Sequence, residues 1–408
     1  MLKTVKYILS PVCVSAALLI ASCSVEDEVV NTPQQQEEGA VVYPKLRIGV
    51  SELKMEAASR AASPMSPDHE KYVRTMALFE FDNEQWHERG DFTYHFIDFV
   101  AGTVDGVAGI GDVHNTEFGI VETTLKEIAF ESRTNGTLCV VANVTEDEVD
   151  DFYTDCMNDG GTYGNISLNQ FKTWALPFDY EGSTAEGYDE SVTGHLKNMY
   201  MFGYYEGPID PASVGDISID LGRLASRLDI TVVNETGSAI TKRLGYHFDN
   251  VCSSAYFFPL LSGVPPTIQA GLARTVICAG EGDPVEGDPD FQIVPATFPD
   301  KATHTRYYYV AAHSAENFNE ATKLHLFYDR RIVNDDVSDD SNTVKVPLCN
   351  VHPSEAANVV NGYSLSRNTR YHFTIRLKKK AASPAKAAES RSEVEYGEQP
   401  GEITVYLP

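Results

Sequence analysis

The residue types that most often perform chemistry are present, but their spacing matches no catalytic motif. Eleven histidines are scattered along the 408 residues without an H-E-x-x-H zinc motif, and His69-Glu70 lacks the second histidine. No G-x-S-x-G nucleophile elbow occurs, and the acidic run 334–340 lacks the glycine and the final glutamate of a calcium loop. We therefore expect no enzyme activity, no bound metal and no other cofactor.

One cysteine does lie in a context that predicts a reaction. Lys3 and Lys6 precede the apolar stretch Val12–Ala21, which is too short to span a membrane, and small residues then lead directly to Cys23. This order resembles the lipobox of a bacterial lipoprotein signal. It predicts that Cys23 becomes the first residue and carries acyl chains, each buried CH₂ contributing about 0.8 kcal/mol of membrane affinity. A plain secretory signal that contains a chance cysteine is the alternative.

The residues after Cys23 indicate where the lipoprotein would go. The acidic run Ser24–Glu28 resembles the surface-export signal of Bacteroides-type outer-membrane lipoproteins. We therefore expect the chain on the outer face of the cell outer membrane.

Composition excludes one large class of partner and leaves the cysteines uninformative. Lys and Arg number 32 against 59 Asp and Glu, a net charge of −27, so no basic surface is available for nucleic acid. Besides Cys23, the exported chain has an odd number of cysteines and no C-x-x-C pair, so spacing identifies neither a disulfide framework nor a zinc site. The sequence leaves open whether Cys252 and Cys278 form a disulfide bridge.

The hydrophobic pattern is that of a β-rich chain with short helices. Residues 45–51 alternate apolar and polar, with Leu46, Ile48 and Val50 on one face, which is typical of a half-buried strand. Ala-, Ser- and Pro-rich sequence around residues 59–64 then predicts an exposed linker. Further strands are expected at 73–82, 137–143, 306–311, 324–328, 343–348 and 370–378, and a capped helix at 145–156.

The order of these features resembles the Bacteroides-type fimbrillin family, the subunits of type V pili. The resemblance rests on the lipobox at Cys23, the early strand, the Arg60-Ala61 pair, the strand 75–82, the strand end 140–143, the segment 221–230 and the run 367–373. It implies two β-sandwich domains of transthyretin-like topology, lipoprotein export, cleavage by an arginine-specific protease between Arg60 and Ala61, and polymerisation by strand donation. The weakly strand-like sequence after Lys380 departs from the family pattern.

Together with the turn cluster at 208–211, the resemblance predicts a division of the chain into five segments. They are a signal peptide at 1–22, a tether with a removable strand at 23–60, an N-terminal sandwich at 61–210, a C-terminal sandwich at 211–380, and a tail at 381–408 with a donor strand at 402–408.

The two ends of the chain carry matching apolar faces. Leu46, Ile48 and Val50 in the early strand have counterparts in Ile403, Val405 and Leu407 at the end of the chain. If cleavage removes the early strand, the edge that opens is a template for a strand from another copy. We then expect loss of 402–408 to cost the monomer little stability. The alternative is that 402–408 pairs within its own chain.

The sequence therefore predicts a fimbrial subunit that supports cell adhesion and acts in the fimbrium after processing. Its expected partners are other copies of itself, other fimbrial subunits, the protease, the outer membrane through Cys23, and a host or bacterial surface ligand. The alternative is a lipid-retained anchor or tip protein, or a glycan-binding lipoprotein that uses tyrosines such as Tyr307, Tyr308 and Tyr309. Core packing of these tyrosines is the competing interpretation.

Overall fold

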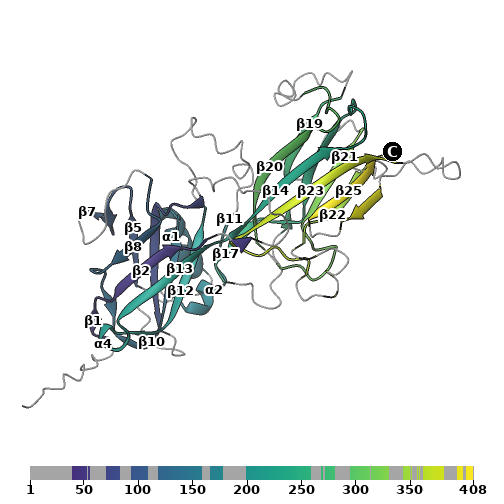
Figure 1. The fold of residues 1–408 in the computed structure, drawn as a ribbon. Helices are drawn as coiled ribbons and strands as arrows, with labels where there is room; N and C mark the ends of the chain where they lie inside the picture. The colour runs from purple at the N-terminus through teal and green to yellow at the C-terminus, as the bar shows by residue number, and fades with distance from the viewer. Residues whose placement is uncertain are drawn as a thin grey trace, which may run out of the picture. The chain divides into compact units, whose positions relative to one another are not determined.

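The described part of the chain, a computed structural model, is built mainly of β-strands (Figure 1). No helix among the described residues is long and apolar enough to cross a membrane. The structure describes residues 39–52, 54–55, 70–82, 93–108, 118–158, 166–177, 199–258, 268–269, 272–280, 295–312, 314–329, 343–349, 351, 356, 358, 362–380, 393–397 and 401–407.

The first half of the chain forms a nine-stranded sheet. Most of its neighbouring strands are antiparallel, but β2 and β13 run parallel. Its strands, in spatial order, are β7 (Val107–Ala108), β6 (Thr103–Val104), β5 (Thr93–Asp98), β4 (Thr75–Asp82), β10 (Arg133–Ala142), β12 (Met201–Ile209), β13 (Asp216–Arg223), β2 (Lys45–Val50) and β8 (Glu122–Leu125).

Both faces of the central strands are buried, which explains their continuous apolar runs. On one face, Leu78 of β4 and Val140 of β10 share a core with Ile48 of β2. On the other face, Phe79 and Cys139 lie under helical and aromatic side chains. Two halves of one sheet thus enclose a common core, as in a β-sandwich.

The second face is covered by short elements. Helix α1 (Glu146–Asn158) begins with the expected capping box: Glu148 N donates to Thr145 Oγ1 at 3.1 Å, and Thr145 N donates to Glu148 Oε2 at 2.8 Å. Phe171 of α2 (Leu168–Lys172) is fully buried beside Phe79, with ring centroids 4.9 Å apart. The small strand pair of β11 (Ala175–Pro177) with β17 (Ser254–Tyr256) adds Leu176 and Ala255 to this second core. The pair of β1 (Val41–Val42) with β9 (Phe130–Glu131) instead adds Val42 and Phe130 to the first core.

The chain changes sheet at Leu224. The turn sequence at 208–211, where the sequence suggested a domain boundary, leads instead into helix α4 (Pro211–Val214) and then into β13 of the same nine-stranded sheet. β13 ends at Arg223, and β14 begins at Ala225 in the next sheet. Segment 221–230 therefore links two sheets.

The second half forms two sheets. The larger one contains β18 (Ile268–Gln269), β16 (Val251–Cys252), β20 (Thr303–Ala311), β14 (Ala225–Asn234), β23 (Thr369–Lys379), β25 (Glu402–Leu407) and β24 (Glu393–Tyr396), with β3 (Lys54–Met55) also on β23. The smaller one contains β19 (Leu272–Cys278), β15 (Leu244–Asp249), β21 (Lys323–Tyr328) and β22 (Thr343–Pro347).

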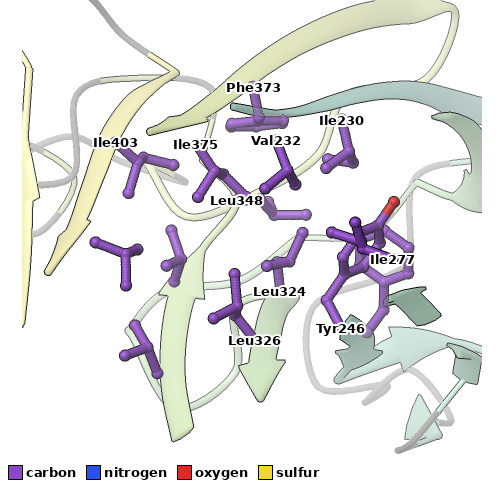
Figure 2. Packing of buried hydrophobic residues seen from close by; sticks show 14 of the residues in the cluster. Ile230, Val232, Tyr246, Ile277, Leu324, Leu326, Leu348, Phe373, Ile375 and Ile403 are labelled. Atoms are coloured by element: carbon purple, nitrogen blue, oxygen red, sulfur yellow. The ribbon is translucent and has the colours of Figure 1, made fainter. Parts of the chain in front are cut away.

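These two sheets enclose a single apolar core. Figure 2 shows Phe373, Ile375 and Ile403 from the larger sheet converging with Leu324 and Leu326 from the smaller one. Alternation along β23 places Tyr371, Phe373, Ile375 and Leu377 in this core, as its sequence pattern predicts.

The expectation of a mostly β chain with β-sandwiches and short helices is confirmed. The strands expected at 73–82, 137–143, 306–311, 324–328, 343–348 and 370–378 are present with slightly different ends. The sequence between Lys380 and Glu402 looked weakly strand-like, yet β24 forms there and pairs with β25.

Candidate functional site

The early strand β2 lies inside a sheet rather than at its edge. It pairs with β13 on one side, in parallel, and with β8 on the other, antiparallel. Leu46 and Ile48 are 0% and 1% exposed, and Val50 packs at the margin of the same core. Removal of β2 would expose the edges of β13 and β8 that it now pairs with and open a groove down to the core.

An ion-pair cluster fixes the start of β2 against β13. Lys45 Nζ and Arg47 Nη2 each lie 2.6 Å from Asp216 Oδ2. The hydrogen bond from Lys45 lowers the pKa of Asp216, although its surroundings are open to water. The cluster gives the parallel pairing a charge preference at its first position.

The segment around β2 reaches both halves of the molecule. Upstream, β1 pairs with β9, and Val42 is buried. Downstream, β3 pairs in parallel with Thr369 and Arg370 at the start of β23, which belongs to the larger sheet of the second half. Residues 41–55 therefore contribute to two cores or their edges.

Two polar side chains hold the end of this segment by its backbone. Arg223 Nη1 donates to Ser51 O at 2.8 Å, and Asn368 Nδ2 donates to Glu52 O at 2.9 Å. Arg223 also donates through Nε to Glu70 O at 2.7 Å and through Nη1 to Asn368 Oδ1 at 2.9 Å. Sequence patterns do not indicate that Arg223 has this role, because a buried arginine that donates hydrogen bonds to backbone carbonyl oxygens has no characteristic spacing.

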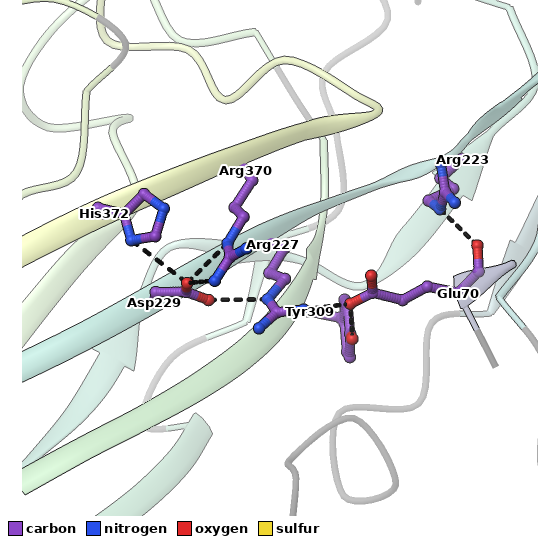
Figure 3. Close-up of polar contacts among 7 residues, drawn as sticks. All are labelled: Glu70, Arg223, Arg227, Asp229, Tyr309, Arg370 and His372. Atoms are coloured by element: carbon purple, nitrogen blue, oxygen red, sulfur yellow. Dashed lines mark hydrogen bonds and ion pairs between the residues drawn. The ribbon is translucent and has the colours of Figure 1, made fainter. Parts of the chain in front are cut away.

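A charged network lies next to this contact (Figure 3). Glu70 is fully buried, and its Oε1 accepts from Arg227 Nη1 at 2.7 Å and from the Tyr309 hydroxyl. Arg227 Nε donates in turn to Asp229 Oδ1 at 2.8 Å, and Arg370 Nε donates to Asp229 Oδ2 at 2.7 Å. Glu70, the first described residue after Arg60 and Ala61, is therefore held in place by this network.

The C-terminal strand β25 lies within its own chain. It pairs in parallel with residues 374–379 of β23, and Ile403, Val405 and Leu407 are buried in the core of the second half. This is the alternative pairing that the sequence left open, and it means that loss of 402–408 would cost the monomer stability. β3 and β25 occupy the same edge of β23, one after the other.

The pattern of β25 is compatible with the place of β2. Both strands pair in parallel with a neighbour, and both bury alternate side chains. With Ile403 in the place of Leu46, Tyr406 falls at Gly49, where an added Cβ would meet no atom closer than 4.0 Å. The place of β2 therefore leaves room at the Cβ of Tyr406.

The remaining predicted cysteines and the predicted cleavage site are as follows in the structure. Cys23, Arg60 and Ala61 lie outside the described residues. Cys252 and Cys278 are free and buried, so the disulfide between them is not formed in this structure.

The three consecutive tyrosines are occupied by packing and charge contacts. Tyr308 lies in the second core with its hydroxyl 2.7 Å from that of Tyr246, and Tyr309 meets Glu70 on the opposite face. The Arg227 guanidinium lies 4.4 Å from the ring centre of Tyr307. This favours the packing interpretation over sugar stacking.

Comparison with known proteins gives similarity to solved structures. No family model and no curated protein matches the sequence. The tip fimbrial protein Mfa3 of Porphyromonas gingivalis has 13% identity and a TM-score of 0.41, with 81% of this chain and 94% of that chain covered. A P. gingivalis fimbrilin has 11% identity and a TM-score of 0.41, with 90% and 97% covered. A fimbrial assembly protein of Parabacteroides distasonis has 10% identity and a TM-score of 0.38, with 90% and 99% covered. These similarities are similarities of fold.

Proposed function

We propose that this chain is a structural subunit of a cell-surface fimbrium that assembles by exchange of strands between copies. The observation that carries the proposal is the place of β2, an N-terminal strand buried between β13 and β8. In the sequence it is followed by Arg60, the proposed cleavage site. The solved structures described above as fimbrial proteins are in keeping with this role.

The energy of the vacated groove supports the proposal. Besides the buried Pro44, cleavage after Arg60 would remove the buried aliphatic side chains of Val42, Leu46 and Ile48. Each contributes about 1.5–3 kcal/mol, roughly 5–9 kcal/mol together, which is of the same order as the whole stability of a typical domain. A cleaved chain therefore gains strongly from a replacement strand.

We propose that β25 of a neighbouring copy supplies that strand. Its Ile403, Val405 and Leu407 would take the places of Leu46, Ile48 and Val50. To be donated, β25 must first leave β23 of its own chain.

Charge explains why the exchange would wait for cleavage. In this register Glu402 takes the place of Lys45 and faces Asp216, and Thr404 takes the place of Arg47. The resident strand β2 therefore places two cations, Lys45 and Arg47, beside Asp216, whereas the incoming strand would place an anion there. The uncut segment, joined to its own chain, is the preferred occupant.

The lipid and the protease complete the proposed pathway. A lipid on Cys23 would hold the precursor at the outer membrane, and an arginine-specific protease would release the chain that starts at Ala61. The partners would be further copies, other fimbrial subunits and an adhesion ligand on a host or bacterial surface.

The test of this proposal is Arg60→Ala. We expect the variant to remain a lipid-bound monomer, because β2 stays in its groove, whereas the natural chain forms polymer with Ala61 as its N-terminus. Gel analysis of unheated surface material measures the amount of polymer, and mass spectrometry identifies the N-terminal residue. Arg47→Ala is the control within the same segment. Unchanged polymer from Arg60→Ala, with polymer lost in Arg47→Ala, would place the cut at Arg47 instead.

A second test addresses the register of the donated strand. Glu402→Lys places a cation opposite Asp216 of the acceptor, so we expect assembly of cleaved subunits to become several-fold faster, about the effect of an exposed ion pair. Light scattering after addition of protease measures the rate. Glu206→Lys makes the same charge change at an exposed position of β12, which neither contacts β25 nor pairs with β2, and serves as control. Equal rates in both variants would argue against this register.

One alternative is favoured by a specific observation. Because β25 completes its own sandwich, a cleaved chain that accepts a strand but never donates its own would lie at one end of the filament, as a tip protein. A lipid-retained anchor keeps Cys23 and therefore β2, so it would not accept a strand. Retention of Cys23 and its lipid on the surface form would distinguish the anchor from the internal subunit.

A further inference from the structure

Two histidines and an aspartate gather on the outer face of the smaller sheet in the second half. Tyr246 of β15 and Leu324 of β21 point into the core. His247, Asp249 and His325 alternate with such core residues, so they lie on the opposite face. They are nevertheless largely buried: His247 is 7% exposed and His325 is 3% exposed.

The strand register brings these side chains together. His247 and His325 are direct partners across the antiparallel pair, and their ring centres are 4.5 Å apart. His247 Nε2 lies 3.2 Å from Asp249 Oδ1, and His325 Nδ1 lies 3.4 Å from Asp249 Oδ2. One atom from each residue can be chosen so that all lie within 4.8 Å of one another.

The chemistry of this cluster is that of metal ligands. Imidazole nitrogens and a carboxylate oxygen are the donor types that Zn²⁺ binds in proteins, and all three are present here. His325 Nε2 has no hydrogen-bond partner in the described part of the chain. Two imidazoles thus converge on one carboxylate in a site sheltered from water.

We propose that His247, Asp249 and His325 bind a divalent transition-metal ion of the Zn²⁺ type. Tetrahedral zinc with bonds of about 2.1 Å separates its ligand atoms by about 3.4 Å, close to the two distances measured here. Imidazole ligands favour Zn²⁺, Cu²⁺ or Ni²⁺, whereas Ca²⁺ and Mg²⁺ prefer oxygen. Water would complete the coordination. The site is independent of fimbrial assembly.

Lys345 determines how tightly the ion is held. Its Nζ lies 3.3 Å from Asp249 Oδ2, so it competes with a metal for that oxygen. The side chain is 46% exposed and can turn into water when an ion arrives. A second lysine, Lys323, donates to Asn319 O at 3.0 Å and lies over the Phe318 ring, so its ammonium group is engaged elsewhere.

The sequence could not reveal this site. His247 and Asp249 are close in sequence, but His325 comes from another strand, and only the pairing of β15 with β21 unites them. The expectation of no bound metal rested on spacing motifs, which detect ligands from one helix or loop.

The experiment uses the purified full chain, stripped with a chelator and titrated with Zn²⁺ by calorimetry. We expect one ion per chain and a rise in Tm on binding. His325→Ala should lose this stoichiometric binding. His304→Ala should bind like the natural chain, because His304 also has a buried Nε2 without a partner but no place in the cluster.

A second variant keeps the test decisive if His325→Ala fails to fold. Lys345→Met removes the competing ammonium from a half-exposed position, so we expect binding about ten-fold tighter, the equivalent of about 1.4 kcal/mol. Unchanged or weaker binding in Lys345→Met, or binding by His325→Ala equal to that of the natural chain, would overturn the proposal. So would the absence of binding to the natural chain.

Discussion

Val405→Asp is expected to lower the stability of the monomer by several kcal/mol and to stop the chain from donating its strand. Val405 is 0% exposed and pairs with Leu377 of β23 and Val394 of β24. A carboxylate there would be buried without a partner, which costs several kcal/mol in addition to the lost apolar burial. Urea unfolding of the uncleaved chain measures this effect.

Thr404→Asp is the matched control. Thr404 lies on the same strand but on the opposite, partly exposed face, so the same charge should cost less than about 1 kcal/mol. If both variants lose equal stability, burial of the Val405 face of β25 does not determine what this strand contributes to the free energy of unfolding.

Mixtures separate the effect on assembly from the effect on stability. A cleaved Val405→Asp chain still has the groove between β13 and β8, so it should accept a strand but not donate one. We therefore expect small amounts of it to shorten polymers of the natural chain, and Thr404→Asp not to do so. Polymers of unchanged length would contradict donation of this strand.

The sequence predicted which faces are buried, because alternation is a local property of a strand. Leu46, Ile48, Ile403 and Val405 all lie in cores, as their spacing indicates. Alternation says nothing about the partner strand, which is set by packing over long separations. The parallel pairing of β2 with β13, from the middle of the chain, was therefore unpredictable.

Pairing also explains the errors made from sequence alone. The expectation that residues 402–408 contribute little to the monomer failed because nothing in them indicates that β23 has a free edge of matching length. Similarly, Arg223 and Asn368 contact the backbone of residues 51 and 52, and backbone acceptors leave no trace in residue types. The change of sheet occurs at Leu224 rather than at the turn cluster, and only this single residue separates the end of β13 from the start of β14.

The buried charges around Glu70 give the second large effect. Glu70→Ala removes one carboxylate from a network in which Arg227 keeps Asp229 as its remaining partner. Breaking a buried pair costs about 3–5 kcal/mol, and the remaining partner places the expected loss near about 3 kcal/mol. Glu70→Gln keeps an acceptor for the Tyr309 hydroxyl and should recover part of this loss.

An exposed pair provides the comparison. Lys242 and Asp329 also form an ion pair, but their side chains are 51% and 41% exposed. Lys242→Ala should therefore cost less than about 1 kcal/mol, because water screens such pairs. A similar loss in Lys242→Ala and Glu70→Ala would mean that burial of the network does not determine its contribution.

Cleavage should make the chain depend more strongly on Glu70. Arg223 is held by Ser51 O, Glu70 O and Asn368 Oδ1, and removal of the segment through Arg60 takes away the first of these. The stretch at Glu70 then becomes the anchor nearest the new N-terminus. We expect Glu70→Ala to destabilise the cleaved chain more than the uncleaved one, measured by urea unfolding of both forms before strands are added. An equal loss in both forms would show that the carboxylate of Glu70 supports the second half of the molecule independently of the segment that is removed.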